Sequence, residues 1–178
     1  MWLQQGREAF SRAYAIADAF AVKTEGKPDH PWYLPMRLQR NQLSIPMGKG
    51  RETLAACKKD FAKSPSETTL HLYLSLLNDL DRSEDILSIQ ETESRVQDII
   101  FPPSKKNLGV WQLLIRAAAE TSATDFVEAH IPQVLEVCTE QDEFEFLMGL
   151  LCLYLGEDQE EKLAAVKKDC LPCCRGSR

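Results

Sequence analysis

The chain has 178 residues, of which 44% are hydrophobic and 27% charged, and this composition excludes a chain that is disordered throughout. Its formal net charge of −6 at pH 7 argues against tight binding of nucleic acid by the chain as a whole. The longest apolar run, 146–155, is about half as long as a bilayer-spanning helix, and the charged Arg7 and Glu8 stand where a signal peptide is apolar, so we expect no membrane association and an intracellular protein, nuclear or cytoplasmic.

The first elements in the chain are predicted to be helices, because apolar residues recur every three to four positions and strand-like alternation is hard to find. One helix is expected over about 2–22, ending in the turn-rich segment 24–28. Pro31 can open the next helix, since the N–H that proline lacks is not needed at the first helical position. Applied to the whole chain, this spacing predicts an all-α protein of about seven to nine helices.

The residue pattern of the segment 50–80 predicts two helices and the turn between them. Ser64 and Glu67 have the spacing of a capping box, with Pro65 at the first position of the second helix. Apolar stripes, which each need a partner helix for burial, run along both helices. They are formed by Leu54, Cys57 and Phe61 in the first helix, and by Leu70, Tyr73, Leu74, Leu77 and Leu80 in the second.

In the second half, one helix is expected from Ser83, which would cap it, to about residue 100. The segment 101–107 contains two prolines and is a candidate sub-boundary between parts of the fold. A helix over 108–121 follows. The next helix is capped by Thr124 and Asp125 and is expected to kink or split at Pro132.

The last predicted helices cover 144–155, which is apolar on most sides, and about 158–169. The expected organisation is a single helical domain over 1–169. A flexible tail that contains cysteines, 170–178, completes the chain.

The segment 50–77 reads GRETLAACKKDFAKSPSETTLHLYLSLL and resembles the half-a-tetratricopeptide (HAT) and tetratricopeptide helical repeats. The residues that carry the resemblance are Phe61, Lys63, Pro65, Leu70, Leu72, Tyr73 and Leu77. The resemblance implies antiparallel helical hairpins stacked as a short α-solenoid. It further implies a non-enzymatic protein–protein interaction scaffold, of the kind found as subunits of complexes in RNA processing or transcription.

Charge divides the chain into two contrasting parts. The segment 37–63 has seven basic and two acidic residues, whereas 117–161 has twelve acidic and no basic residues. We therefore expect a protein partner, a peptide or helix in an apolar groove, with the acidic part favouring a basic partner. The alternatives are two solvated faces without a partner, or a nucleic-acid-associated module in which the basic segment contacts phosphates and an aromatic ring stacks on bases. The candidate contact residues are Trp32, Tyr33, Arg37, Arg40, Arg51, Lys58, Lys59, Asp142, Glu143 and Glu145.

The cysteines offer a third hypothesis, a small zinc-binding or thiol protein. Cys170 and Cys173 have the C-x-x-C spacing, with Cys174 adjacent, but a tetrahedral zinc site needs two further ligands. His130 and Cys138 are the other plausible contributors. A metal-free tail is the preferred interpretation. The other three cysteines, Cys57, Cys138 and Cys152, are expected to be small buried hydrophobes on helices.

No catalytic residue and no cofactor is assigned. A nucleophile would need a histidine and an orienting acid nearby. His30 precedes a proline, His71 is expected on an exposed helix face, and His130 is expected in a core or at its edge. The segment 48–53 lacks the spacing of a phosphate-binding loop and is interpreted as a plain helix start.

Overall fold

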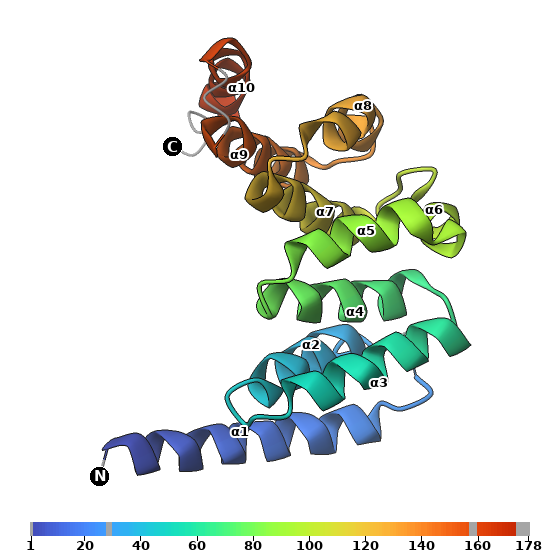
Figure 1. Cartoon of the computed structure of the whole chain (residues 1–178), viewed down its shortest axis with the longest axis vertical. Helices are drawn as coiled ribbons and strands as arrows, with labels where there is room; N and C mark the ends of the chain where they lie inside the picture. The colour runs from blue at the N-terminus through green and yellow to red at the C-terminus, as the bar shows by residue number, and fades with distance from the viewer. Residues whose placement is uncertain (1, 28–29, 157–159, 174–178) are drawn as a thin grey trace. The chain divides into compact units, whose positions relative to one another are not determined.

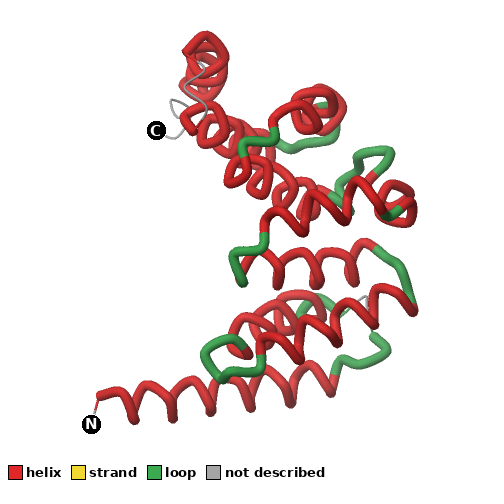
Figure 2. The backbone as a smooth tube through the Cα atoms, viewed as in Figure 1, coloured by secondary structure: helices red, strands yellow, loops and turns green. Residues whose placement is uncertain are grey.

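The computed structural model describes residues 2–27, 30–156 and 160–173. Within these ranges it contains ten α-helices and no β-strand (Figures 1 and 2). The prediction of an all-helical chain is therefore confirmed, with more helices than expected. In order they are α1 (Trp2–Lys23), α2 (Tyr33–Ser44), α3 (Gly50–Lys63), α4 (Glu67–Asp79), α5 (Ser83–Thr92), α6 (Ser94–Ile100), α7 (Leu108–Thr121), α8 (Thr124–Leu135), α9 (Glu140–Gly156) and α10 (Glu160–Cys173).

The additional helix arises because the predicted helix from Ser83 to residue 100 is interrupted at Glu93. That residue has extended backbone angles (φ −102°, ψ 105°) and separates α5 from α6. The hydroxyl of Thr92 donates to the Ser88 carbonyl at 2.6 Å, and side chains of this kind compete with the helix for backbone groups. The amide of Gln97 compensates by donating to the carbonyl of Gln90.

The chain forms two compact units, residues 1–81 and 82–178. The boundary lies between α4 and α5, and the loop 101–107 falls inside the second unit. A single domain over 1–169 stays a prediction. None of the described helices combines the length and the apolar character needed to cross a membrane.

In unit 1, α2 packs against α1, α3 and α4, and α3 packs against α4. Among the described side chains of α1, the buried ones are the small Ala17 and Ala21, which let α2 approach closely. Pro35 stands in the first turn of α2, in the place expected for Pro31, because α2 begins at Tyr33; a proline in the first turn removes no intrahelical hydrogen bond. The larger core side chains are Phe61, Leu70, Tyr73, Leu74, Leu76 and Leu77.

The capping box of α4 lies two residues later than predicted. The N-cap is Ser66, whose hydroxyl accepts from the N–H of Thr69 at 3.2 Å, while the Thr69 hydroxyl accepts from the N–H of Ser66 at 3.0 Å. Ser64 instead ends α3, and its carbonyl accepts from the Thr69 hydroxyl. The prediction at Ser64 is wrong because Thr69 provides the returning side chain that Glu67 was expected to provide.

In unit 2, α7 packs against α5, α8 and α9, and α10 packs on α9. Trp111 of α7 is fully buried, and its indole N–H donates to the carbonyl of Ile100 at 3.3 Å. The helices α7 and α9 approach so closely at Gly149 that a Cβ atom there would lie 2.9 Å from Cγ2 of Ile115. Gly149 therefore sets the separation of these two helices.

Several predicted helix ends in unit 2 are wrong. Ser83 lies inside α5 and its hydroxyl donates to the carboxylate of Glu120, so it does not cap the helix. The helix α8 runs through Pro132, so of the two predicted outcomes, a kink or a split, the split does not occur. Just before the proline, Phe126 and His130 pack against Trp111 of α7. The helix α10 extends to Cys173, so residues 170–173 are helical where a tail was expected. The rest of that predicted tail, 174–178, lies outside the described residues.

Candidate interaction surfaces

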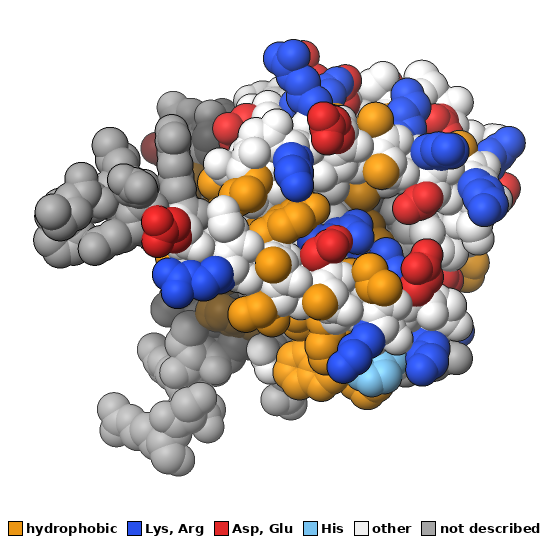
Figure 3. Space-filling view, turned by 90° about the horizontal axis from the view of Figure 1, so that it is seen from below, with side chains coloured by type: hydrophobic (Ala, Val, Ile, Leu, Met, Phe, Trp, Pro, Cys, Tyr) orange, Lys and Arg blue, Asp and Glu red, His pale blue; other side chains and the backbone are white. Residues whose placement is uncertain are grey.

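The helix α1 exposes an apolar face, which we call the α1 face, centred on Ile16. Ile16 is 69% exposed. Its neighbours three, four and seven positions away lie on the same side of a helix. They are Ala9, Arg12, Ala13, Ala19, Phe20 and Lys23, all of them exposed except the half-buried Phe20. Figure 3, seen from below Figure 1, looks onto this side of unit 1 and shows hydrophobic side chains gathered among charged ones. The only charges among the named residues are positive.

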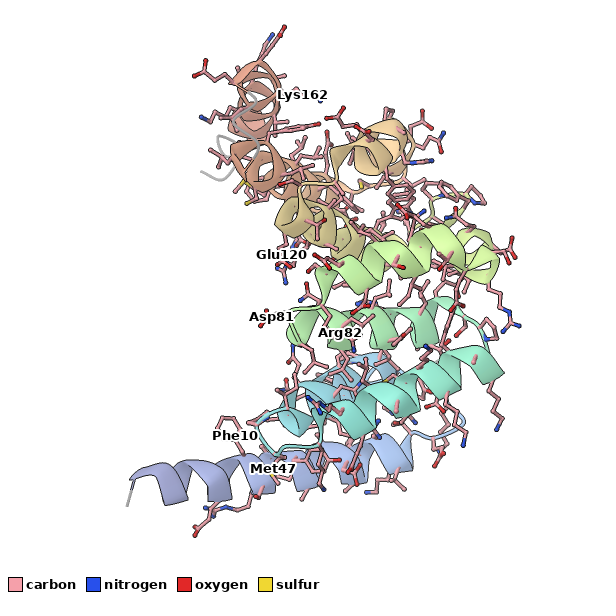
Figure 4. The ribbon with its side chains drawn as sticks, viewed as in Figure 1. Phe10, Met47, Asp81, Arg82, Glu120 and Lys162 are labelled. Atoms are coloured by element: carbon pink, nitrogen blue, oxygen red, sulfur yellow. The ribbon has the colours of Figure 1, made fainter. Side chains whose placement is uncertain are left out.

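The exposed apolar area of unit 1 extends beyond the α1 face. Phe10 lies nearer the beginning of α1 and is partly exposed, next to Ser11, whose hydroxyl donates to the sulfur of Met47 at 3.5 Å (Figure 4). Trp32, just before α2, is 59% exposed. Its backbone N–H donates to Nδ1 of His30, whose ring contacts Phe20 edge-on. Trp32 is thus one of the predicted contact residues that the structure leaves accessible.

The helix α9 exposes a second apolar face, the α9 face, centred on Met148. Met148 is 37% and Leu155 57% exposed. The positions three, four and seven residues from Met148 are Gln141, Phe144, Glu145, Leu151, Cys152 and Leu155. One charge belongs to this set, the exposed Glu145, whose carboxylate accepts from the side-chain amide of Gln112 at 2.7 Å.

The acidic residues predicted to contact a partner cluster at the beginning of α9. The carboxylate of Asp142 accepts from the backbone N–H and the hydroxyl of Thr139 at 3.0 and 2.5 Å. These two hydrogen bonds lower the pKa of Asp142, and the positive charge of Lys105 contributes less. Glu143 is exposed. Asp142 therefore stabilises the start of the helix, while Glu143 and Glu145 remain accessible.

Two of the predicted basic contact residues are used inside unit 1. The guanidinium of Arg37 lies 4.5 Å from the centre of the Tyr33 ring and donates to the Ala21 carbonyl. Arg40 forms an ion pair with Asp18 at 3.8 Å. Arg37 thus connects α2 to α1 and to the first turn of α2 itself, and Arg40 connects α2 to α1. Tyr33 is correspondingly occupied by Arg37 and is a poor platform for a base.

The remaining basic candidates lie on α3. Arg51, Lys58 and Lys59 are exposed, and their spacing places Arg51 and Lys58 on one side of the helix. Nucleic-acid binding by the basic segment stays a prediction, and Arg51, Lys58 and Lys59 are the residues that would contact the phosphates.

The cysteines that the structure describes differ from one another. Cys57 is buried, accepts from the side-chain amide of Asn41 at 3.3 Å, and has a pKa raised chiefly by its burial. Cys138 lies after the end of α8; its thiol donates to the Val134 carbonyl, and burial, with the charges of Asp142 and Glu143, raises its pKa to about 11. Cys152 is exposed, contrary to the prediction of a buried hydrophobe.

The structure does not test the proposed metal site at the C-terminus. The side chains of Cys170 and Cys173, at the end of α10, and Cys174 lie outside the described residues. Among the side chains that are described, no group of three or more His, Cys, Asp or Glu is placed to hold a metal ion. A zinc or thiol function of the C-terminal cysteines stays a prediction.

The histidines occupy three different environments. His130 packs against Phe101, Trp111 and Phe126, and its Nδ1 is 2.8 Å from the Phe126 carbonyl oxygen, as expected for a histidine at the edge of a core. His30 is exposed in the segment before α2. His71 is half-buried, and this burial lowers its pKa, so the prediction of an exposed histidine is wrong.

The two apolar faces were missed by the sequence analysis, although their signal is present in the sequence. In α1, Ile16 and three alanines, Ala9, Ala13 and Ala19, lie on a different side from the buried Ala17 and Ala21, and α9 is apolar on most sides. Only the packing of each helix shows which of its apolar sides stays uncovered. No family model, no curated protein and no solved structure matches this chain.

Proposed function

We propose that this chain is a non-enzymatic protein–protein interaction scaffold, built from helical hairpins in the manner of a short α-solenoid. The contacts between consecutive helices, α1 with α2, α3 with α4, and α9 with α10, support hairpins as the building unit. The resemblance of 50–77 to HAT and tetratricopeptide repeats supports the same organisation. Such repeats act by presenting surfaces to partners.

The observation that carries the proposal is the α9 face. Large apolar side chains that remain exposed on a folded chain are typical of an interaction site. Glu145 lies on this face and Glu143 is exposed in the first turns of the same helix. The partner that fits is an amphipathic helix with an apolar stripe and flanking lysines or arginines.

The test is the binding of a synthetic helical peptide of about 18 residues, with a leucine stripe and lysine flanks, measured by fluorescence anisotropy. We expect the peptide to bind the chain, Met148→Glu to abolish binding, and Glu145→Lys to weaken it about fivefold at low salt. Glu161→Lys, at an exposed position of α10, is the matched control and should bind as the original chain does. Equal binding of a peptide with glutamates in place of its lysines would refute the charge selection, and unchanged binding by Met148→Glu would refute the site.

A further inference from the structure

The α1 face and the α9 face of this chain are complementary to one another. We propose that the α1 face of one chain docks on the α9 face of a second copy, so that copies associate head to tail. This inference rests on the proposed function and names a partner for the same surface, namely α1 as the basic amphipathic helix that α9 accepts.

The first argument is the size of the side chains. Three of the five apolar residues of the α1 face are alanines, whereas the α9 face carries the large Phe144, Met148, Leu151 and Leu155. Helices pack when the side-chain ridges of one fit the grooves of the other. A face of small residues receives large side chains better than it receives a second face of small residues. Pairing α1 with α9 thus buries more apolar surface than pairing α1 with α1.

The second argument is charge. The charges of the α1 face, Arg12 and Lys23, are positive, and the charge of the α9 face, Glu145, is negative. The same contrast extends over the whole units: residues 1–81 carry eleven basic and nine acidic residues, a net charge of +2, and residues 82–178 carry ten and eighteen, a net charge of −8. Contacts between two identical faces would bring like charges together, which disfavours them. Pairing of the α1 face with the α9 face is therefore favoured over pairing of two α1 faces or of two α9 faces.

A contact between two different faces has a defined consequence for assembly. Each copy that joins covers one face and brings another free one, so the average mass rises with protein concentration instead of stopping at a dimer. An interface of one helix against another is small. We therefore expect weak association, with a dissociation constant on the order of 100 µM.

The experiment is sedimentation equilibrium of the full chain between about 10 and 500 µM, in reducing buffer so that the exposed Cys152 forms no cross-links. We expect the average mass to rise with concentration in 50 mM salt and to rise less in 0.5 M salt. The variants Ile16→Glu and Met148→Glu should each be monomeric. Their equimolar mixture should form dimers and stop there, because one intact α1 face and one intact α9 face remain.

The matched control is Val22→Glu. Val22 is also an exposed apolar residue of α1, but it lies about 120° around the helix from Ile16, so this variant should associate like the original chain. Circular dichroism should show the same helical content for all variants. The proposal is overturned if the original chain stays monomeric at 500 µM, if Met148→Glu still associates, or if the mixture of the two variants stays monomeric.

The outcome also separates this inference from the proposed function. The peptide assay, repeated with Ile16→Glu to prevent self-association, measures the α9 face alone. If the peptide binds while the original chain remains monomeric, self-association is refuted and the scaffold function stands. If the peptide does not bind, the scaffold function loses its support, whatever the sedimentation result.

Discussion

The side chain of Asn107, which is buried at the start of α7, connects the loop 101–107 to the end of α6. Its amide donates to the carbonyls of Ile99 at 2.9 Å, Ile100 at 3.1 Å and Pro102 at 3.2 Å, and its oxygen accepts from the N–H of Ser104 at 2.8 Å. A buried carbonyl without a partner is unfavourable. This one residue therefore satisfies the carbonyls of Ile99 and Pro102, and it shares the carbonyl of Ile100 with the indole N–H of Trp111.

We expect Asn107→Asp to lower the free energy of unfolding by about 3 kcal/mol, because a carboxylate would face three carbonyl oxygens in a buried position. Asn107→Ala should cost less, about 1–2 kcal/mol, since it removes the donors without adding a charge. Urea denaturation followed by circular dichroism measures both changes. Lys106→Ala, at the exposed neighbouring residue, is the control. Equal losses for the Asp and Ala variants would show that the donated hydrogen bonds contribute little.

At the scale of one element, the start of α4 allows a test between two capping residues: Ser64, which the sequence predicts, and Ser66, which caps the helix in the structure. A capping residue contributes about 1 kcal/mol through the backbone N–H that its side chain satisfies. We expect Ser66→Ala to lower the free energy of unfolding by about that amount, and Ser64→Ala to change it by less than about 0.5 kcal/mol. Thermal and urea unfolding of the two variants provide the comparison. The prediction fails if Ser64→Ala is the more destabilising of the two.

The elements that could be predicted from the sequence are those that an apolar stripe defines. The helix α7 has the predicted bounds, and Leu70, Tyr73, Leu74 and Leu77 are buried as expected. It was harder to predict where a helix is interrupted and where it continues. At Glu93, side chains that compete for backbone groups accompany the interruption. The helix α8 continues through Pro132, next to the packed ring of His130. The first is a local competition for backbone groups within α5, and the second is accompanied by a tertiary contact with α7; an apolar pattern along one helix contains neither.

The candidate surfaces, too, could be predicted only in part. Glu143 and Glu145 are accessible as predicted, but Arg37 and Arg40 are used within unit 1, because a nearby tyrosine ring and Asp18 provide partners for them. The charge pattern indicates which segments are basic or acidic. It does not indicate which of the charges are used inside the fold.

At the scale of the whole molecule, each compact unit has a core of its own. In residues 82–178 this core includes Trp111, Leu114, Phe146 and Leu153, all fully buried. The fragment 82–178 contains one tryptophan, Trp111, so its fluorescence reports the folding of this unit alone. A unit with a core of its own could in principle fold by itself.

We therefore expect the fragment 82–178 to show the blue-shifted emission of a buried tryptophan and a cooperative loss of that emission in urea. Trp111→Phe in the same fragment provides the background signal, and circular dichroism provides an independent measure of helix content. Emission in native buffer equal to that in 8 M urea would show that the unit depends on residues 1–81 to fold.

The contact between Gly149 and Ile115 also restricts how this chain can vary. Even the smallest side chain at position 149 would collide with the β-branch of the isoleucine, whereas leucine at position 115 has no methyl group attached to its Cβ. The two positions are thus linked: an alanine in α9 becomes compatible with this helix spacing once the isoleucine in α7 has been exchanged. Exchange of the isoleucine first therefore avoids the overpacked intermediate that the reverse order of substitutions passes through.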